Sequence, residues 1–366
     1  MRSFTCAVAL SAVAGQALGS VHHMFSGVFN GTDIYAIEFD DETNSLTLAS
    51  SIVSTATSSK WIAIDERKQN IYVSNGAYTS LEYSSTVTMD STCNNANYVL
   101  ASTESPYVVF GASYSTVCPA QMMSVESDGS LTAVIANVTH GSSAGVHGLA
   151  LTSDNEFLYS ADDTGNAIWV HSVNITSGEV AEVQYLAAPT GADPRHMVVH
   201  PKGQYAYVVF EALSEIGVYS RDTATGELTY TNTSYPLLPS TYTNASSYWA
   251  DEVQFSVNTN GTPSYMYAAT RSQTTTIPGY ASAFSIDAET GAIVNQLFLT
   301  ETTGSGGSAN SVPSAPFVEE YFAITDSGSN FVEVWMITTN GTESATGKAV
   351  AHLDVSAGPP NAVWFD

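Results

Sequence analysis

The chain has 366 residues, enough for one large all-β domain or two ordinary ones, and its 20 Tyr, 14 Phe and 26 Gly favour many short strands joined by tight turns. It has only nine Lys plus Arg against 35 Asp plus Glu, which gives a formal net charge of −26. Such an acidic surface repels nucleic acid and anionic membranes, so we expect neither as a partner. A small anionic ligand would also be repelled unless basic side chains gather at one place.

Residues 1–19 have the pattern of a secretory signal peptide. One basic residue precedes an apolar run that ends at Ala14, and the small residues Ala17 and Gly19 stand at the cleavage spacing. The apolar run is too short to span a bilayer. We therefore predict a secreted, extracellular protein that begins after about Gly19.

Two further features agree with secretion. Cys93 and Cys118 remain as an even pair after the signal peptide, and in an oxidising compartment a disulfide is their expected state, with two unpaired buried thiols as the alternative. Seven Asn-x-Ser/Thr sequons lie mostly in predicted turns, where a glycan is tolerated. These candidate glycosylation sites are Asn30, Asn137, Asn174, Asn232, Asn244, Asn260 and Asn340.

After the signal peptide the chain is built from repeated strand units. Residues 27–51 predict two strands around a turn, with no inner-strand pattern before them. A complete unit follows at residues 58–85, whereas residues 86–132 are the least regular part of the chain. Four clear units come next, each with an apolar strand, a turn and an aromatic strand; they begin near Val146, Pro194, Trp249 and Asn310.

About seven units of four strands each, with a period of roughly 40 to 60 residues, predict a β-propeller. The last residues, 361–366, have the pattern of the inner strand that the first unit lacks. We therefore predict one domain over residues 20–366, an all-β, seven-bladed β-propeller whose first blade is closed by the C-terminal strand. A pair of β-sandwiches is the competing architecture, but it gives no reason for polar residues that recur at matched positions.

Alignment of the units on their central tyrosines places polar residues in two columns. The first column contains His147, Arg195, Asn310 and, from the terminal strand, Asn361, with Asp251 in or next to it; the second contains Asp163, Glu211, Arg271 and Asp326. The innermost strands of a propeller line its central channel, so matched positions converge on one axis. The sequence therefore predicts a ring of polar side chains around the channel axis, with two of the chain's few basic residues in or beside it.

At these residues the sequence resembles the lactonase-type seven-bladed propellers, and within them the fungal carboxy-cis,cis-muconate cyclase branch. The resemblance covers nearly the whole chain from Asp33 onward, and its densest segments are GVHGLALTSDNEFLYSADDTGNAIWVH, DPRHMVVHPKGQYAYVVFEA and FAITDSGSNFVEVW. It implies an active site at the channel mouth in which His147, Glu211, Arg195 and Arg271 are catalytic. Residues 90–97 and Ser308 depart from that branch, where the sequence is more basic.

The reaction implied by the resemblance is reversible intramolecular addition of a carboxylate across a conjugated double bond, without a metal or an organic cofactor. Arginine forks hold carboxylates in two-point contacts, which suits a small anionic substrate. Glu211 is the first choice for transferring the proton and His147 the second. We assign substrate binding to His196, Asp251 and Asn310.

Structural roles compete with these assignments. Arg195 and Arg271 would serve equally as struts paired with acidic residues, because buried charges must be paired in any case. His147 and His196 would serve as hydrogen-bonding residues, the aspartates of the second column as turn residues, and the two asparagines as strand-lining residues. A secreted hydrolytic lactonase and a non-catalytic ligand-binding propeller are the alternative functions, and the sequence leaves the oligomeric state open.

Overall fold

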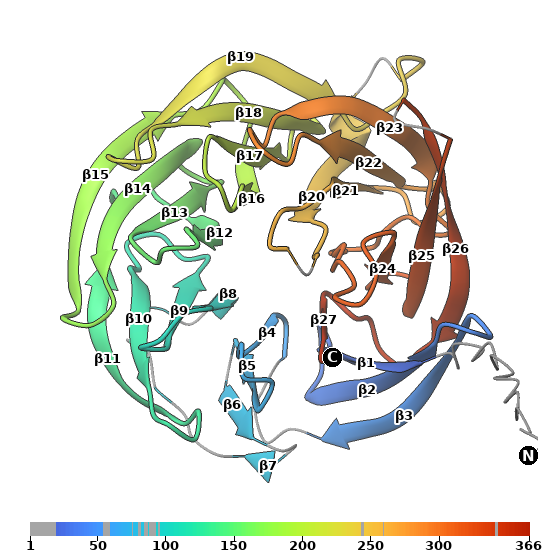
Figure 1. The fold of residues 1–366 in the computed structure, drawn as a ribbon, viewed down its shortest axis with the longest axis horizontal. Coiled ribbons are helices and arrows are strands. Elements are labelled where there is room, and N and C mark those ends of the chain that lie inside the picture. Colours follow the sequence, from blue (N-terminus) through green and yellow to red (C-terminus); the bar gives the residue numbers. More distant parts are fainter. Residues whose placement is uncertain are drawn as a thin grey trace, which may run out of the picture.

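The structure is a computed structural model that describes residues 20–53, 59–74, 76–79, 82–83, 87, 93, 96–242, 245–258, 260–340 and 343–366. These residues form seven antiparallel sheets arranged as a ring around a central axis (Figure 1). The one helix among these residues is a single 3-10 turn, η1 (Ala245–Ser247). No helix in this part of the chain is long and apolar enough to cross a membrane. The predicted all-β propeller is confirmed, while the predicted signal peptide lies outside the described residues.

Each sheet is a blade that runs from the axis to the rim (Figure 1). From the inside outward, the first blade contains β27 (Ala362–Trp364), β1 (Val21–Ser26), β2 (Asp33–Asp40) and β3 (Ser45–Val53), the second β4 (Ile62–Ile64), β5 (Asn70–Val73), β6 (Gly76–Thr79) and β7 (Glu82–Tyr83), and the third β8 (Ala96–Ala101), β9 (Val108–Ser113), β10 (Ala120–Val125) and β11 (Leu131–Val138). The fourth contains β12 (Val146–Leu151), β13 (Phe157–Asp162), β14 (Ala167–Asn174) and β15 (Glu179–Ala187), and the fifth β16 (Pro194–Val199), β17 (Tyr205–Phe210), β18 (Glu215–Arg221) and β19 (Leu228–Pro236). The sixth contains β20 (Tyr248–Phe255), β21 (Tyr265–Ser272), β22 (Tyr280–Ile286) and β23 (Ile293–Glu301), and the seventh β24 (Tyr321–Asp326), β25 (Phe331–Thr339) and β26 (Ala345–Asp354).

The two ends of the described chain close the ring. β27 takes the innermost place of the first blade and pairs antiparallel with β1, with Met24 opposite Trp364. The sequence analysis missed β1 but placed the terminal strand correctly. Trp364 is buried, and its indole Nε1–H donates a hydrogen bond to the carbonyl of Pro313 in the neighbouring blade at 3.1 Å. Packing between blades therefore supports the closing pair of strands.

The blade of β24–β26 departs from the predicted four strands. The segment 310–315, predicted as its inner strand, runs beside β24 but forms only an isolated bridge between Ser314 and Phe322. Backbone hydrogen bonds from Ala323 N to Pro313 O (2.9 Å) and from Thr325 N to Ser311 O (3.3 Å) still hold the segment in place. Proline has no N–H to donate, so Pro313 interrupts the ladder that a regular strand needs.

Burial along each blade explains the sequence pattern. All residues of β13 are buried, and so are nearly all of β17, because a second strand packs against neighbouring blades on both faces. The rim strand β15 instead mixes exposed and partly buried residues, since one of its faces meets solvent. The aromatic second strands that marked the repeat are therefore the core of the ring.

The central tyrosines of the repeat link each blade to the next one. The hydroxyls of Tyr72, Tyr159 and Tyr207 donate to the backbone carbonyls of Gly129 (3.1 Å), Gly226 (2.8 Å) and Gly291 (2.5 Å), each in a turn of the following blade. Tyr267 donates in the same way to Glu319 O. The residue type that revealed the repeat thus also joins its units.

The covalent predictions have separate outcomes. The structure contains the Cys93–Cys118 disulfide, with 5.5 Å between the Cα atoms, so that prediction is confirmed. Asn244 lies outside the described residues, and the other six sequon asparagines are exposed, as glycan attachment requires. Their glycosylation stays a prediction.

Substitution of Tyr207 by Phe tests the tyrosine link. We expect Tyr207→Phe to lose about 1 to 3 kcal/mol of unfolding free energy, because the buried carbonyl of Gly291 loses its donor. Tyr219→Phe in the same blade is the matched control: Tyr219 is fully buried and its hydroxyl has no hydrogen-bond partner in the described part of the chain. Urea unfolding measures both, and equal losses in the two variants would contradict the link.

Candidate active site

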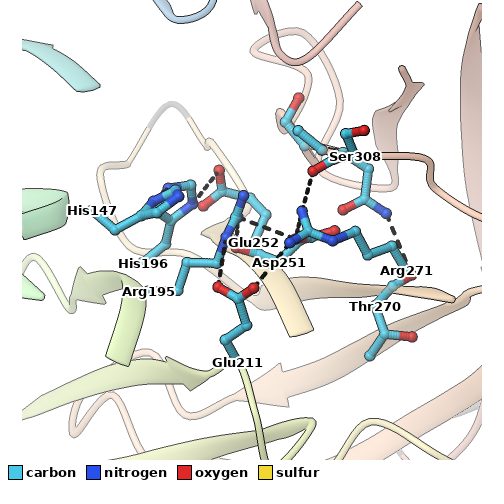
Figure 2. Close-up of polar contacts among 12 residues, drawn as sticks. His147, Arg195, His196, Glu211, Asp251, Glu252, Thr270, Arg271 and Ser308 are labelled. Atoms are coloured by element: carbon cyan, nitrogen blue, oxygen red, sulfur yellow. Dashed lines mark hydrogen bonds and ion pairs between the residues drawn. The ribbon is translucent and has the colours of Figure 1, made fainter. Parts of the chain in front are cut away.

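The two predicted columns meet at one end of the channel. His147 and Arg195 are the second residues of the inner strands β12 and β16, and Asp251 lies in the first half of β20. Glu211 follows β17, and Arg271 lies near the end of β21. Antiparallel pairing brings the start of an inner strand beside the end of the second strand. Figure 2 shows these side chains converging from three successive blades.

The inner-strand residues of the site occupy β-bulges. In β8, β12 and β20 the register with the second strand shifts by one residue at Asn97, His147 and Asp251. In β16 the same shift includes Arg195 and His196. A bulged residue is left out of the ladder and its side chain is redirected. Three residues of the first column, His147, Arg195 and Asp251, therefore stand at bulges, which the alternation of apolar and polar residues does not predict.

Arg195, Arg271, Glu211 and Asp251 form a closed cluster that we call the charge ring. Glu211 Oε2 lies 3.1 Å from Arg195 Nε, and Glu211 Oε1 lies 2.9 Å from Arg271 Nη2. Asp251 Oδ1 lies 3.3 Å from Arg195 Nη1 and 2.7 Å from Arg271 Nη1. Each carboxylate thus bridges both guanidiniums (Figure 2), and the four charges balance.

Further contacts hold the two arginines in position. Arg195 Nη1 donates to the backbone carbonyl of Asp251 at 2.6 Å, and Arg271 Nη1 donates to the carbonyl of Ser308. The guanidinium of Arg271 also lies over the ring of Trp249, 4.8 Å from its centroid. The pairing expected of structural struts is therefore present, and it orients both forks as a binding site also requires.

The two carboxylates of the ring differ in exposure. The side chain of Asp251 has no exposed area, whereas that of Glu211 is 14% exposed. Burial raises the pKa of Glu211 above its usual value, and the neighbouring guanidiniums offset this only in part. Burial also raises the pKa of Asp251, against the same two arginines. Glu211 is thus the member that both faces the open side and takes up a proton more readily than an ordinary glutamate.

A second set of contacts runs from His147 away from the charge ring. His147 Nδ1 lies 3.0 Å from His196 Nε2, and His196 Nδ1 lies 3.0 Å from Glu252 Oε2. His196 is 1% exposed and lies behind His147, so the role in substrate binding assigned to it stays a prediction. Burial, followed by the charges of the arginines, lowers the pKa of His147 well below its usual value. His147 is therefore uncharged at neutral pH.

Glu252 is the residue of this site that the sequence analysis missed. In a regular strand, adjacent residues such as Asp251 and Glu252 point to opposite faces. The bulge at Asp251 removes that alternation, so both acidic side chains serve the site. The available signal was the adjacency of two acidic residues within a largely apolar inner strand.

Asp163, of the second column, lies beside His147 through Tyr114. The ring of Tyr114 packs edge-on against that of His147 at 5.4 Å, and its hydroxyl donates to Asp163 Oδ2 at 2.5 Å. Burial raises the pKa of Asp163 to about 6, and the charge of Glu211 adds to this effect. Asp163 is therefore more than the turn residue that the sequence suggested.

The remaining column residues support the scaffold. Asp326 accepts hydrogen bonds from the backbone N–H groups of Gly306, Gly328 and Ser329, as a turn residue does. Asn361 bonds both the N–H and the carbonyl of Ile62 at 3.2 and 3.0 Å. Asn310 is buried and donates to Thr270 O at 3.4 Å, so it lies behind Arg271 rather than at the mouth. Its assignment to substrate binding stays a prediction.

Among the described residues, no group of three or more His, Cys, Asp or Glu side chains is arranged to hold a metal ion.

Comparison with known proteins defines the class. The chain belongs to the lactonase family of seven-bladed β-propellers, whose model, "Lactonase, 7-bladed beta-propeller", matches residues 23–296. It is 29% identical over 374 residues to the carboxy-cis,cis-muconate cyclase of Neurospora crassa. This alignment covers 94% of this chain and 100% of the cyclase. These two matches confirm the resemblance drawn from the sequence.

Solved structures agree with the fold. The periplasmic gluconolactonase of Pseudomonas aeruginosa superposes with a TM-score of 0.76 at 16% identity, over 94% of this chain and 99% of that chain. A protein from Lactobacillus plantarum superposes with a TM-score of 0.76 at 20% identity, over 95% of this chain and 100% of that chain. At these identities the likeness shows the propeller alone.

The pKa of Asp163 gives a test by pH. A carboxyl whose folded-state pKa is raised binds its proton more tightly in the folded state, so stability falls as pH rises from about 4 to about 6. Asp163→Asn cannot ionise, so its unfolding free energy relative to the unmodified protein should rise by up to about 3 kcal/mol over that interval. Urea unfolding of both proteins at pH 4 and pH 7 measures this difference, and a difference independent of pH would refute it.

Proposed function

We propose that this propeller is a cycloisomerase that interconverts a small unsaturated polycarboxylate, of the 3-carboxy-cis,cis-muconate type, and its lactone. The observation that carries the proposal is the charge ring, in which two oriented arginines share a carboxylate that is partly open to solvent. The full-length similarity to the Neurospora cyclase supports the same reaction. Membership of the lactonase family also supports an enzyme that acts on lactones or on their open acids.

Substrate binding begins on the Glu211 side of the ring. Asp251 is fully buried and holds both guanidiniums from behind, so an incoming carboxylate meets them where Glu211 now lies. Planar guanidinium forks suit two-point contacts with carboxylates. An anionic substrate beside Glu211 raises the pKa of this carboxyl further, because two negative charges close together disfavour ionisation. Binding thereby favours the protonated form of Glu211.

Lactonisation then needs one bond-forming step and one proton transfer. An oxygen of a substrate carboxylate forms a bond to one carbon of the double bond, and the π electron pair forms a new C–H bond with the proton of Glu211 at the neighbouring carbon. The carboxylate becomes an ester, so each turnover takes up one proton, which Glu211 regains from solvent. The arginines stabilise the charge that develops on the remaining carboxylates and the enolate.

Substitutions in the charge ring test this function. With 3-carboxy-cis,cis-muconate, the loss of diene absorbance measures turnover, and we expect Glu211→Gln to lower kcat by about 10²- to 10⁴-fold because no acid remains in place. Arg271→Lys should raise KM by at least about tenfold, since the fork is lost and about 1.4 kcal/mol of binding corresponds to a factor of ten. Arg221→Lys is the matched control, because Arg221 bonds Tyr159 away from the channel mouth.

Absence of turnover in the unmodified protein at high concentration would overturn the cycloisomerase. Hydrolysis of a gluconolactone or muconolactone would then support the second candidate, a hydrolytic lactonase. That candidate is favoured by a local match at 31% identity over 104 residues to the 6-phosphogluconolactonase of an Enterobacter species, which spans 28% of this chain. Hydrolysis with and without a chelator distinguishes an arginine-assisted reaction from a metal-assisted one.

We also propose that the protein is secreted and glycosylated. The sequence pattern of residues 1–19, the exposed sequons and the Cys93–Cys118 disulfide support this. Expressed as the full chain in a eukaryotic secretory host, the protein should appear in the medium beginning at about Ser20 and lose mass on treatment with an endoglycosidase. N-terminal sequencing and mass spectrometry check both, and a retained N-terminus with an unchanged mass would contradict the proposal.

A further inference from the structure

Glu252, His196 and His147 form a continuous line of contacts that we call the histidine chain. The two contacts, Glu252 Oε2 to His196 Nδ1 and His196 Nε2 to His147 Nδ1, are both 3.0 Å long and join β20, β16 and β12 (Figure 2). Glu252 and His196 are each 1% exposed, whereas His147 is partly exposed at the end that holds the charge ring. The proposed reaction gives no role to Glu252 or His196.

The contacts of the chain determine where the protons lie. An ionised carboxylate can only accept, so His196 Nδ1 carries a hydrogen toward Glu252. In a neutral imidazole the other nitrogen is then an acceptor, and His196 Nε2 receives the Nδ1–H of His147. His147 Nε2 is left with a free lone pair.

The surrounding structure fixes both imidazoles. The rings of Trp61 and Tyr98 pack against His196 with centroids 4.9 and 5.2 Å away. Gly148 allows the close approach of β12 and β16, because a Cβ atom there would lie 2.6 Å from His196 Cδ2 and 2.6 Å from Arg195 O. The side chain of Asn97 adds a hydrogen bond to the carbonyl of His147 at 3.1 Å.

Glu252 also follows Asp251 of the charge ring directly in β20. It lines a cavity of about 500 Å³ that follows the later halves of the inner strands and reaches the exposed residues Glu66 and Asp366. The carboxylate end of the histidine chain thus lines this cavity, whereas the four residues of the charge ring are not among its lining residues. Its carboxylate end is separate from the bridging carboxylates that hold the arginines.

We propose that Glu252 is a positioning residue that, through His196, holds His147 as the Nδ1–H tautomer with its Nε2 lone pair directed to the site. In this arrangement His147 offers a hydrogen-bond acceptor at Nε2, and Glu211 remains the group that donates the proton to carbon. This separates the roles of the two candidate proton carriers. The inference deepens the proposed function and depends on it only for its kinetic test.

Nitrogen NMR of the folded protein tests the tautomer without any turnover. In protein labelled with ¹⁵N-histidine, long-range proton–nitrogen spectra distinguish the Nδ1–H and Nε2–H forms, and His147→Gln identifies the signals of His147. We expect His147 and His196 as Nδ1–H tautomers in the unmodified protein, and loss of that single state in Glu252→Gln, whose amide can also donate. An Nε2–H tautomer of His147, or unchanged spectra in Glu252→Gln, would overturn the inference even if the protein is an active cycloisomerase.

Kinetics supply the second readout. Glu252→Gln should lower kcat by about 10- to 100-fold with KM changed less than about twofold, since outer partners that orient a histidine have effects of that size. Glu333→Gln is the matched control: Glu333, on β25, is about as buried as Glu252, and its carboxylate lies 2.9 Å from Nδ1 of His352 on β26, away from the channel. Equal kcat values for Glu252→Gln and the control would count against the positioning role. Without measurable turnover in any protein, the proposed function fails and the NMR result alone decides this inference.

Discussion

The pairing of β27 with β1 is the constraint on which the rest of the molecule depends. A ring of sheets has no free edge only when its first and last blades are joined, and here three residues of the C-terminal strand make that joint. Closure fixes the distance of every inner strand from the axis. Side chains from β12, β16, β20 and β21 can then meet within hydrogen-bonding distance although they are far apart in sequence.

The charge ring shows what this closed scaffold sustains. Removing four charged groups from water is costly, and a balanced cluster with short contacts recovers that cost without adding much to stability. The value of such a cluster is therefore the fixed orientation of two guanidiniums. Asp251 holds that orientation from the buried side, and Glu211 occupies the side from which a ligand can enter. Asp251 thus has a structural role, whereas an incoming carboxylate can take the place of Glu211, although both side chains make similar contacts.

The sequence predicted much of this arrangement because the repeated units of one chain can be aligned with each other. Matching the units on Tyr159, Tyr207 and Tyr267 placed the four members of the charge ring in two columns, together with five residues outside the ring, since equivalent positions of a propeller share one radius. It could not select Glu252 or the interruption at Pro313. Both depend on local backbone register, and a shift of one residue in a strand leaves the composition of the pattern unchanged. It also gave no sign that the tyrosines contact the following blade, because the acceptors are main-chain carbonyls that have no side-chain signature.

At the bulges of the inner strands, the residues that line the site are different from the residues that pair to build the blade. Asn97, His147 and Asp251 each stand outside the regular ladder, and the residues after them resume the pairing that builds the blade core. Exchange of a side chain at these points alters the lining of the channel and leaves the hydrogen-bonded ladder of the strand in place. Such a propeller combines a constant strand scaffold with variable bulge residues around its axis. Substitutions at these residues can therefore change substrate specificity one blade at a time while the scaffold is retained.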